Sequence, residues 1–134
     1  MGRARDLAIL IRHMSYNADA NQMETSVVLE SAGKERGSST TTATTQFALH
    51  TFAHASYASG RYLIAMSRGS DYHSLEIHLV NDGSSVDMTQ YGEIKSATLA
   101  TFDADISGSD CRLLCTPDSA TSTDIKFDVT LVDA

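Results

Sequence analysis

From Phe47 onward, apolar and polar residues alternate along the chain in runs of about seven to ten residues, with turn-forming residues between the runs. Residues 72–81 show the alternation most clearly, and a second long run lies close to the C-terminus. A repeat of two residues places successive side chains on opposite faces of a strand, so each run predicts a strand with one buried face. The residues expected to face the core in these two runs are Leu75, Ile77, Leu79, Ile125, Phe127, Val129 and Leu131.

Further runs predict strands at residues 46–53, 61–68, 85–91, 98–106 and 110–117. Residues 61–68 are nearly all apolar, which predicts a central strand covered on both faces. The turn Asn81-Asp82-Gly83 contains residues that tolerate a positive φ and should form a hairpin, and Gly92 is expected to end the strand that follows. Roughly seven or eight antiparallel strands without an internal helix predict a mainly β fold, with an antiparallel, jelly-roll-like β-sandwich as the leading architecture.

The N-terminal part has a different pattern. Four apolar residues follow the i, i+3, i+4, i+7 spacing of one helical face and predict a short amphipathic helix over residues 3–14. These residues are Leu7, Leu10, Ile11 and Met14. Residues 15–24 predict no regular element, residues 25–31 predict a short strand, and the Gly-, Ser- and Thr-rich residues 33–46 predict a linker or extended arm. The sequence thus predicts an N-terminal helix and arm at residues 1–44 and a β-sandwich domain at residues 45–134.

Composition and charge narrow the possible functions. The chain has 134 residues, enough for one domain with a single core, and it is acidic, with a net charge of −7 and a pI near 5.0. Because nucleic-acid binders need a positively charged face, this charge argues against a nucleic-acid partner. No stretch is long and apolar enough for a membrane span, and the N-terminus lacks the features of a secretion signal. We therefore expect no membrane association, and a protein that stays in the cytoplasm until it is assembled into a larger structure.

The cysteines and histidines are the candidate metal ligands. Cys111 and Cys115 lie on one predicted strand at a separation of about 13 Å, too far for a disulfide, so we expect two reduced, buried thiols. His50 and His54 have the spacing of two zinc ligands on a helix, but their segment predicts a strand and contains no acid that would serve as a general base. His73 and His78 face opposite sides of one strand. We therefore expect no metal site at any of them.

Asp103 and Asp105 are the candidates for catalysis. They are expected on one face of a strand about 7 Å apart, near the carboxylate separation of inverting glycosidases, and with Asp110 they could bind calcium weakly. Acids that alternate with inward apolar residues are more typical of a solvated strand face, and the chain has no Trp to hold a sugar ring. We therefore expect no catalytic site, no cofactor and no metal.

Two segments resemble a known β-domain. They are GRYLIAMSRGSDYHSLEIHLVNDGSSVDMTQYGEI and LATFDADISGSDCRLLCTPDSATSTDIKF. This domain recurs in structural proteins of marine tailed phages, particularly phages of cyanobacteria, as a module of tail fibres and other particle components. The resemblance covers residues 45–131 and is most specific at residues 101–108, at Arg112-Leu113-Leu114 and at Thr116-Pro117. The two cysteines depart from the family, which more often has Val, and residues 13–44 do not align.

The resemblance implies a non-enzymatic structural protein of the virion, either fibre-like, at the neck, or decorating the capsid. The opening residues 3–8, RARDLA, are similar to the start of many phage fibre proteins, where they lead a segment that attaches to the particle. The expected attachment residues are Arg3, Arg5, Leu7, Leu10, Ile11 and Met14. We expect a homo-oligomer, with a trimer first, and partners among the capsid, neck or tail proteins. The alternative is a carbohydrate-binding module for a host surface glycan, with Tyr57, Tyr62, Tyr72 and Tyr91 as candidate stacking residues.

Overall fold

The structure, a computed structural model, describes residues 14–17, 22–25 and 32–134. Most of the predicted helix at residues 3–14 and most of the predicted strand at residues 25–31 lie outside the described residues. The chain divides into two compact units, Met1–Glu30 and Ser31–Ala134. No helix in the described ranges is long and apolar enough to cross a membrane.

The first unit contains an antiparallel pair of short strands, β1 (Met14–Asn17) and β2 (Gln22–Thr25). Met14, expected as the last apolar residue of the helix, instead lies in β1 and pairs with Thr25. The prediction of no regular element between residues 15 and 24 is therefore wrong for both strands. Each strand has only four residues, which is too short a run for a two-residue repeat to be recognised in the sequence.

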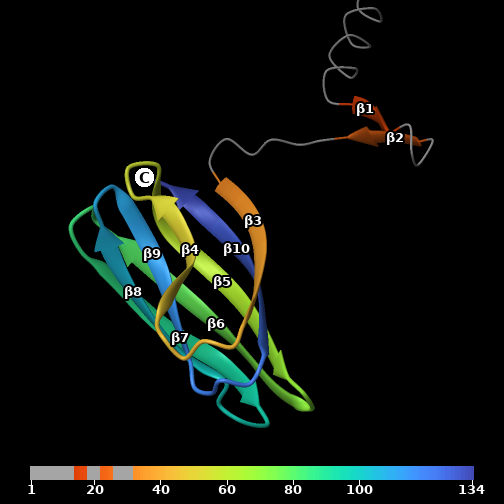
Figure 1. Ribbon diagram of the computed structural model, residues 1–134. Coiled ribbons are helices and arrows are strands. Elements are labelled where there is room, and N and C mark those ends of the chain that lie inside the picture. Colours follow the sequence, from red (N-terminus) through yellow and green to blue (C-terminus); the bar gives the residue numbers. More distant parts are fainter. Residues whose placement is uncertain (1–13, 18–21, 26–31) are drawn as a thin grey trace, which may run out of the picture. The chain divides into compact units, whose positions relative to one another are not determined.

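The second unit consists of two antiparallel sheets. Its strands are β3 (Ala32–Thr41), β4 (Phe47–Ala53), β5 (Tyr57–Arg68), β6 (Asp71–Asn81), β7 (Val86–Lys95), β8 (Ala100–Ser107), β9 (Asp110–Pro117) and β10 (Thr123–Asp133). The five-stranded sheet has the order β3-β10-β5-β6-β7 and the three-stranded sheet the order β4-β9-β8 (Figure 1). The mainly antiparallel β prediction is confirmed. Because β5, β6 and β7 follow one another as a meander in one sheet, the jelly-roll arrangement is not confirmed.

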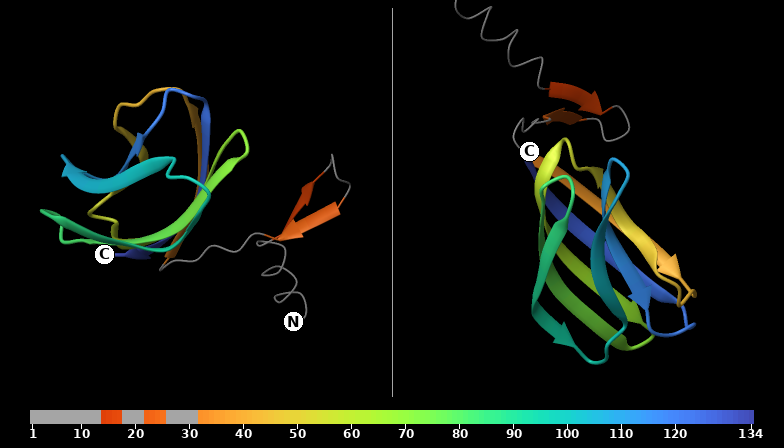
Figure 2. Two further views of the ribbon diagram at one scale, coloured as in Figure 1. Left: turned by 90° about the horizontal axis from the view of Figure 1, so that it is seen from below. Right: turned by 90° about the vertical axis from the view of Figure 1, so that its left-hand side faces the viewer.

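The two sheets of this unit curve around one hydrophobic core (Figure 2). Every residue expected to face the core from β6 and β10 is buried there, as are three residues of β9, each with at most 7% of its surface exposed. These residues are Leu75, Ile77, Leu79, Cys111, Leu113, Cys115, Ile125, Phe127, Val129 and Leu131. The alternation of apolar and polar residues therefore indicated the correct face of each of these strands, because a sheet with one covered face selects apolar side chains at every second position.

Two details of the predicted strands are wrong. β5 is not covered on both faces: Tyr62 and Ile64 are buried, but Leu63 is 52% exposed, because the three-stranded sheet covers only one face of the five-stranded sheet. Gly92 does not end β7. It has a φ of 64° and lies where the register between β6 and β7 shifts, so the strand passes through a β-bulge and continues to Lys95.

The interpretation of residues 33–46 as a linker is also wrong, because residues 32–41 form β3. This strand pairs with β10 along its full length, from Ala32 opposite Val132 to Thr41 opposite Thr123. The pattern of the sequence did not indicate this strand, because β3 contains no large apolar residue that could face the core. At Gly37 the ring of Phe127 fills the space on the inner side instead: a Cβ atom there would lie 2.6 Å from the Cζ atom of Phe127.

Replacing Gly37 with Val should therefore destabilise the domain. The new side chain would meet the Phe127 ring and force it, or the edge of β3, out of place, at a cost of about 1–3 kcal/mol. Urea unfolding followed by circular dichroism measures this loss. Ser38→Val is the matched control, because Ser38 is exposed and adjacent on the same strand. Equal stability of the two variants would mean that the position of the Phe127 ring does not require a residue without a Cβ atom at position 37.

Candidate functional site

The structure gives no arrangement of the expected attachment residues as a group. Arg3, Arg5, Leu7, Leu10 and Ile11 lie outside the described residues, and Met14 lies in β1. Their role as attachment residues therefore stays a prediction from the sequence. The groups that the structure brings together all lie in the second unit.

Edge strands β3 and β4 are connected by a hydrogen-bond network of three polar side chains, Glu35, His50 and Tyr62. His50 of β4 bonds through Nε2 to Glu35 Oε2 at 2.6 Å and through Nδ1 to the Tyr62 hydroxyl at 2.7 Å. Burial is the main reason that the pKa of Tyr62 is raised, with smaller contributions from Cys111 and Glu35, so the phenol stays protonated. Tyr62 is fully buried and beyond the reach of a ligand. We interpret this hydrogen-bond network as a structural link between the two sheets.

A second histidine, His73 of β6, bonds to one residue of β7 and to one residue just before β8. The buried His73 accepts a hydrogen bond at Nδ1 from the backbone N–H of Leu99, at 3.2 Å, and lies 3.0 Å from Glu93 Oε2 through Nε2. Because Nδ1 accepts a hydrogen bond, Nε2 carries the ring proton and donates a hydrogen bond to Glu93. Lys95 approaches the other oxygen of Glu93 at 2.6 Å. His78 is exposed on the opposite face of β6, as predicted.

Glu93 should make the domain acid-sensitive. Hydrogen bonds from Lys95 and His73 lower the pKa of Glu93 to about 2, from an ordinary value of 4.5. A carboxylate with a lowered pKa contributes stability that is fully present above 4.5 and is lost as the pH falls toward 2. Glu93→Gln should therefore lose less stability than the wild type between pH 5 and about 2. Urea midpoints across this range measure the slopes, with Asp87→Asn as the control; a Gln variant with the wild-type slope would contradict the role of Glu93.

The two candidate catalytic acids lie on the outer face of β8. Asp105 forms a two-point ion pair with Arg112 of β9, with Nε and Oδ1 separated by 2.8 Å, and this hydrogen bonding holds the pKa of Asp105 below its usual value. A general acid must be protonated near neutral pH, so Asp105 is unsuited to that role. Asp103 accepts a hydrogen bond from the backbone N–H of Ala104. Residues 32–134 and the short strands β1 and β2 contain no cluster of three His, Cys, Asp or Glu residues that could hold a metal.

Cys111 and Cys115 are free and buried, as predicted. Burial raises the pKa of Cys111 to about 11, with a smaller contribution from Asp105, and raises that of Cys115 to about 12. Because the thiolate is the reactive form, neither cysteine is suited to nucleophilic chemistry.

The four tyrosines that were candidates for stacking divide into two groups. Tyr62 is fully buried and Tyr57 is half-buried against the core. Tyr72 is 55% exposed and Tyr91 is 37% exposed, both on the outer face of the five-stranded sheet. All large exposed hydrophobic side chains of residues 33–134 lie on this face. They are Leu63, Tyr72, Val80, Tyr91, Ile94 and Val132.

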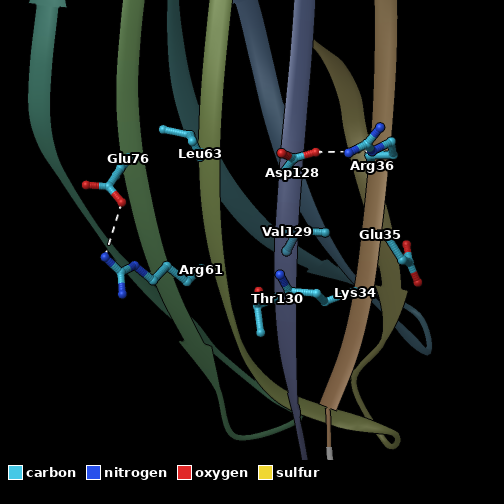
Figure 3. Close-up of a pocket in the computed structure, with 9 residues that line it drawn as sticks. All are labelled: Lys34, Glu35, Arg36, Arg61, Leu63, Glu76, Asp128, Val129 and Thr130. Atoms are coloured by element: carbon cyan, nitrogen blue, oxygen red, sulfur yellow. Dashed lines mark hydrogen bonds and ion pairs between the residues drawn. The ribbon is translucent and has the colours of Figure 1, made fainter. Parts of the chain in front are cut away.

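A groove of about 430 Å³ lies on the same outer face, across β3, β10, β5 and β6 (Figure 3). Two neighbouring rows of residues, defined by strand register, cross the face here. We call the first the basic row: Lys34, Thr130, Arg61, His78 and Thr89. We call the second the mixed row: Arg36, Asp128, Leu63, Glu76 and Tyr91. Register therefore places cations, hydroxyls and two large side chains with apolar surfaces on one exposed surface.

The carboxylates of the mixed row already have cationic partners. Arg36 Nε lies 3.6 Å from Asp128 Oδ1, and Arg61 Nη2 lies 3.2 Å from Glu76 Oε1 (Figure 3). Lys34 forms no ion pair within residues 32–134. Because an ammonium has three donors and a guanidinium five, the groove has hydrogen-bond donors to spare and is suited to a ligand rich in acceptors.

The sequence matches no family model and no curated protein. The solved structures that are similar in part include three tailspike proteins of Acinetobacter phages. The first, from Acinetobacter baumannii phage AM24, has 9% identity and a TM-score of 0.48 over 77% of this chain and 26% of its own. The second, from Acinetobacter phage vB_ApiP_P1, has 16% identity and a TM-score of 0.41 over 90% and 25%. The third, protein gp49 of Acinetobacter baumannii bacteriophage Fri1, is a capsular polysaccharide depolymerase and has 15% identity and a TM-score of 0.39 over 78% and 20%.

The chain thus spans about a quarter of the length of the first two neighbours and a fifth of the third. No residue role is carried over from these proteins.

The sequence did not reveal the groove. Lys34, Glu35 and Arg36 lie in the segment interpreted as a linker, so their participation in a sheet was missed. Arg61 and Leu63 were predicted on a strand covered on both faces, so the pattern did not indicate them as surface residues. One signal was available: Arg61 and Glu76 are polar residues at alternate positions of two consecutive strands, which indicates one exposed face.

Proposed function

We propose that the chain is a non-enzymatic structural component of a tailed-bacteriophage virion, fibre-like, at the neck, or decorating the capsid. The resemblance over residues 45–131 supports this role. Its most specific residues, 101–108, Arg112-Leu113-Leu114 and Thr116-Pro117, form most of the β8–β9 hairpin, where Asp105 is paired with Arg112. That pair carries the non-enzymatic part of the proposal, because Asp105 is held by its cross-strand partner, where it stabilises the hairpin and is unsuited to act as a general acid.

The groove on the opposite sheet is lined by none of these motif residues. We therefore assign to the motif the stabilisation of the β-domain. The outer face of the five-stranded sheet is then available for a function particular to this protein. We assign attachment to the segment before β3, with Leu10 and Ile11 as its apolar contacts, and a homotrimer as the assembled form.

Incorporation into particles tests the structural role. Antibody labelling of purified particles should detect the chain at one location, and mass spectrometry should find it at a fixed copy number. Leu10→Asp with Ile11→Asp should prevent incorporation and keep the wild-type melting temperature, because both changes lie outside the β-domain. The matched control Ser38→Asp also introduces a charge but lies on an exposed position of β3. A chain absent from particles would contradict the structural role, and normal incorporation of the double variant would move attachment to the β-domain.

Carbohydrate binding is a second candidate function, and the exposure of Tyr72 and Tyr91 on one face favours it. Tyr91 lies next to Glu76 in the mixed row, and Glu76 is bonded to Arg61, so an aromatic ring and polar groups share one surface. A protein that used its tyrosines only for packing would bury them. Glycan-array binding of the purified chain measures this function, and Tyr91→Ala should weaken any binding that it shows, while Tyr57→Phe should not. An array without a bound glycan would remove this candidate and leave the structural role untouched.

A further inference from the structure

We propose that the outer-face groove binds an anionic oligosaccharide, one that carries carboxylate or similar groups along its length. This inference rests on the proposed carbohydrate-binding function and names its ligand class. The observation that carries it is the basic row, Lys34, Thr130, Arg61, His78 and Thr89, which crosses all five strands without an acidic residue.

The row is unusual for this chain because the protein as a whole has a net charge of −7. Adjacent strands are about 4.8 Å apart, so the row extends over about 19 Å, and Lys34 and Arg61 lie about 10 Å from each other. An extended ligand several sugar rings long can therefore meet both cations at once. The two threonines lie between the cations and at the end of the row, where their hydroxyls can bond to sugar oxygens.

The pairing of charges in the groove determines the sign of the ligand. Arg36 lies 3.6 Å from Asp128 and Arg61 donates a hydrogen bond to Glu76, so an arginine offsets the charge of each carboxylate. Lys34 has all its donors free of ion pairs within residues 32–134, and Arg61 is 64% exposed, with a single hydrogen bond to Glu76. The remaining capacity is therefore that of donors with positive charge, and it suits acceptors with negative charge.

The neighbouring side chains favour a sugar over other polyanions. Leu63 and Tyr91 of the mixed row are exposed beside the basic row and offer apolar surfaces to the C–H faces of sugar rings. An acidic peptide would meet the cations but would gain little from the two apolar side chains.

The test uses the full chain with three probes: an oligogalacturonate of about six residues, a neutral malto-oligosaccharide of the same length, and poly-glutamate. Calorimetry at about 0.05 M salt should give a Kd for the oligogalacturonate about tenfold below that for the neutral sugar, and the difference should shrink at about 0.5 M salt. Lys34→Gln should raise the Kd for the oligogalacturonate about fivefold. Lys126→Gln should leave this Kd within about twofold of the wild-type value. Lys126 is the matched control, because it is exposed on the same face two rows away and the charge change is the same.

The outcomes separate the two proposals. Binding of neither sugar by a folded chain would remove carbohydrate binding at this groove, and this inference with it. Equal binding of both sugars, unchanged in Lys34→Gln, would keep carbohydrate binding and overturn the anionic preference. Poly-glutamate binding as tight as the oligogalacturonate would show that the groove recognises charge alone, and the assignment to a sugar would be wrong.

Discussion

Deletion of residues 1–44 should leave a domain that aggregates or unfolds near room temperature, whereas deletion of residues 1–30 should leave it folded. The longer deletion removes β3, which contributes a ten-residue strand paired along its whole length with β10. β10 would become a bare edge, Phe127 would lose the backbone of Gly37 that lies against its ring, and His50 would lose Glu35. The expected loss is about 5 kcal/mol or more, comparable to the whole stability of a small domain.

Thermal unfolding of both truncated chains measures this difference. The shorter deletion is the matched control, because it ends at the boundary between the two compact units and leaves every strand of the two sheets intact. Similar melting temperatures for the two chains would mean that β3 adds little to the stability of the sheets. The division at residue 45, which the sequence indicated, would then be adequate for folding.

Arg68→Ala should destabilise the domain far more than the loss of an exposed charged side chain, by about 2–4 kcal/mol. Arg68 ends β5 and has a side chain only 12% exposed. Its guanidinium donates to Thr123 Oγ1 at 2.8 Å and to the Leu99 carbonyl at 3.0 Å, and it approaches Asp118 Oδ1 at 2.7 Å. Removing it would take a charged donor from each of these groups, and would leave the buried Thr123 hydroxyl with only the Thr121 carbonyl and the buried Leu99 carbonyl with only the Asp118 N–H.

Arg61→Ala is the matched control for this substitution. Arg61 lies on the same strand and also forms an ion pair, but its side chain is 64% exposed, so its loss should leave the stability nearly unchanged. Urea unfolding of the two variants measures the difference directly. Equal losses would mean that the buried contacts of Arg68 are replaced by solvent and do not hold the loop ends together.

The sequence predicted the faces of the strands far better than their neighbours. In β6 and β10 every second residue is apolar, and this alternation identified the buried faces correctly, because burial of one face acts on each position separately. β3 was missed because its inward positions hold Glu35, Gly37 and Ser39, which carry no apolar signal. Its place in the sheet depends on the Phe127 ring of β10, a long-range contact that no local pattern contains.

The same reason explains why the groove could not be predicted. Lys34 and Arg61 become neighbours only because Thr130 pairs with both, on a strand at the far end of the sequence. The link between Glu35, His50 and Tyr62 likewise joins three separate strands. Strand register sets such neighbours, and register depends on the complete sheet and its turns. Single residues such as His78 or Cys111 could be placed by local alternation, but clusters could not.

The pairing of β3 with β10 also determines how the domain bears a pulling force. Ala32 lies opposite Val132, so the chain enters β3 and leaves β10 at the same end of the sheet. Tension applied between these two points loads the hydrogen bonds one pair at a time, and the strands peel apart at low force. Tension between Ala32 and Thr123, which lie at opposite ends of the paired strands, would instead act along both strands and load these hydrogen bonds together. The domain is therefore mechanically stronger when it is pulled along β3 and β10 than when it is pulled between the start of β3 and the end of β10.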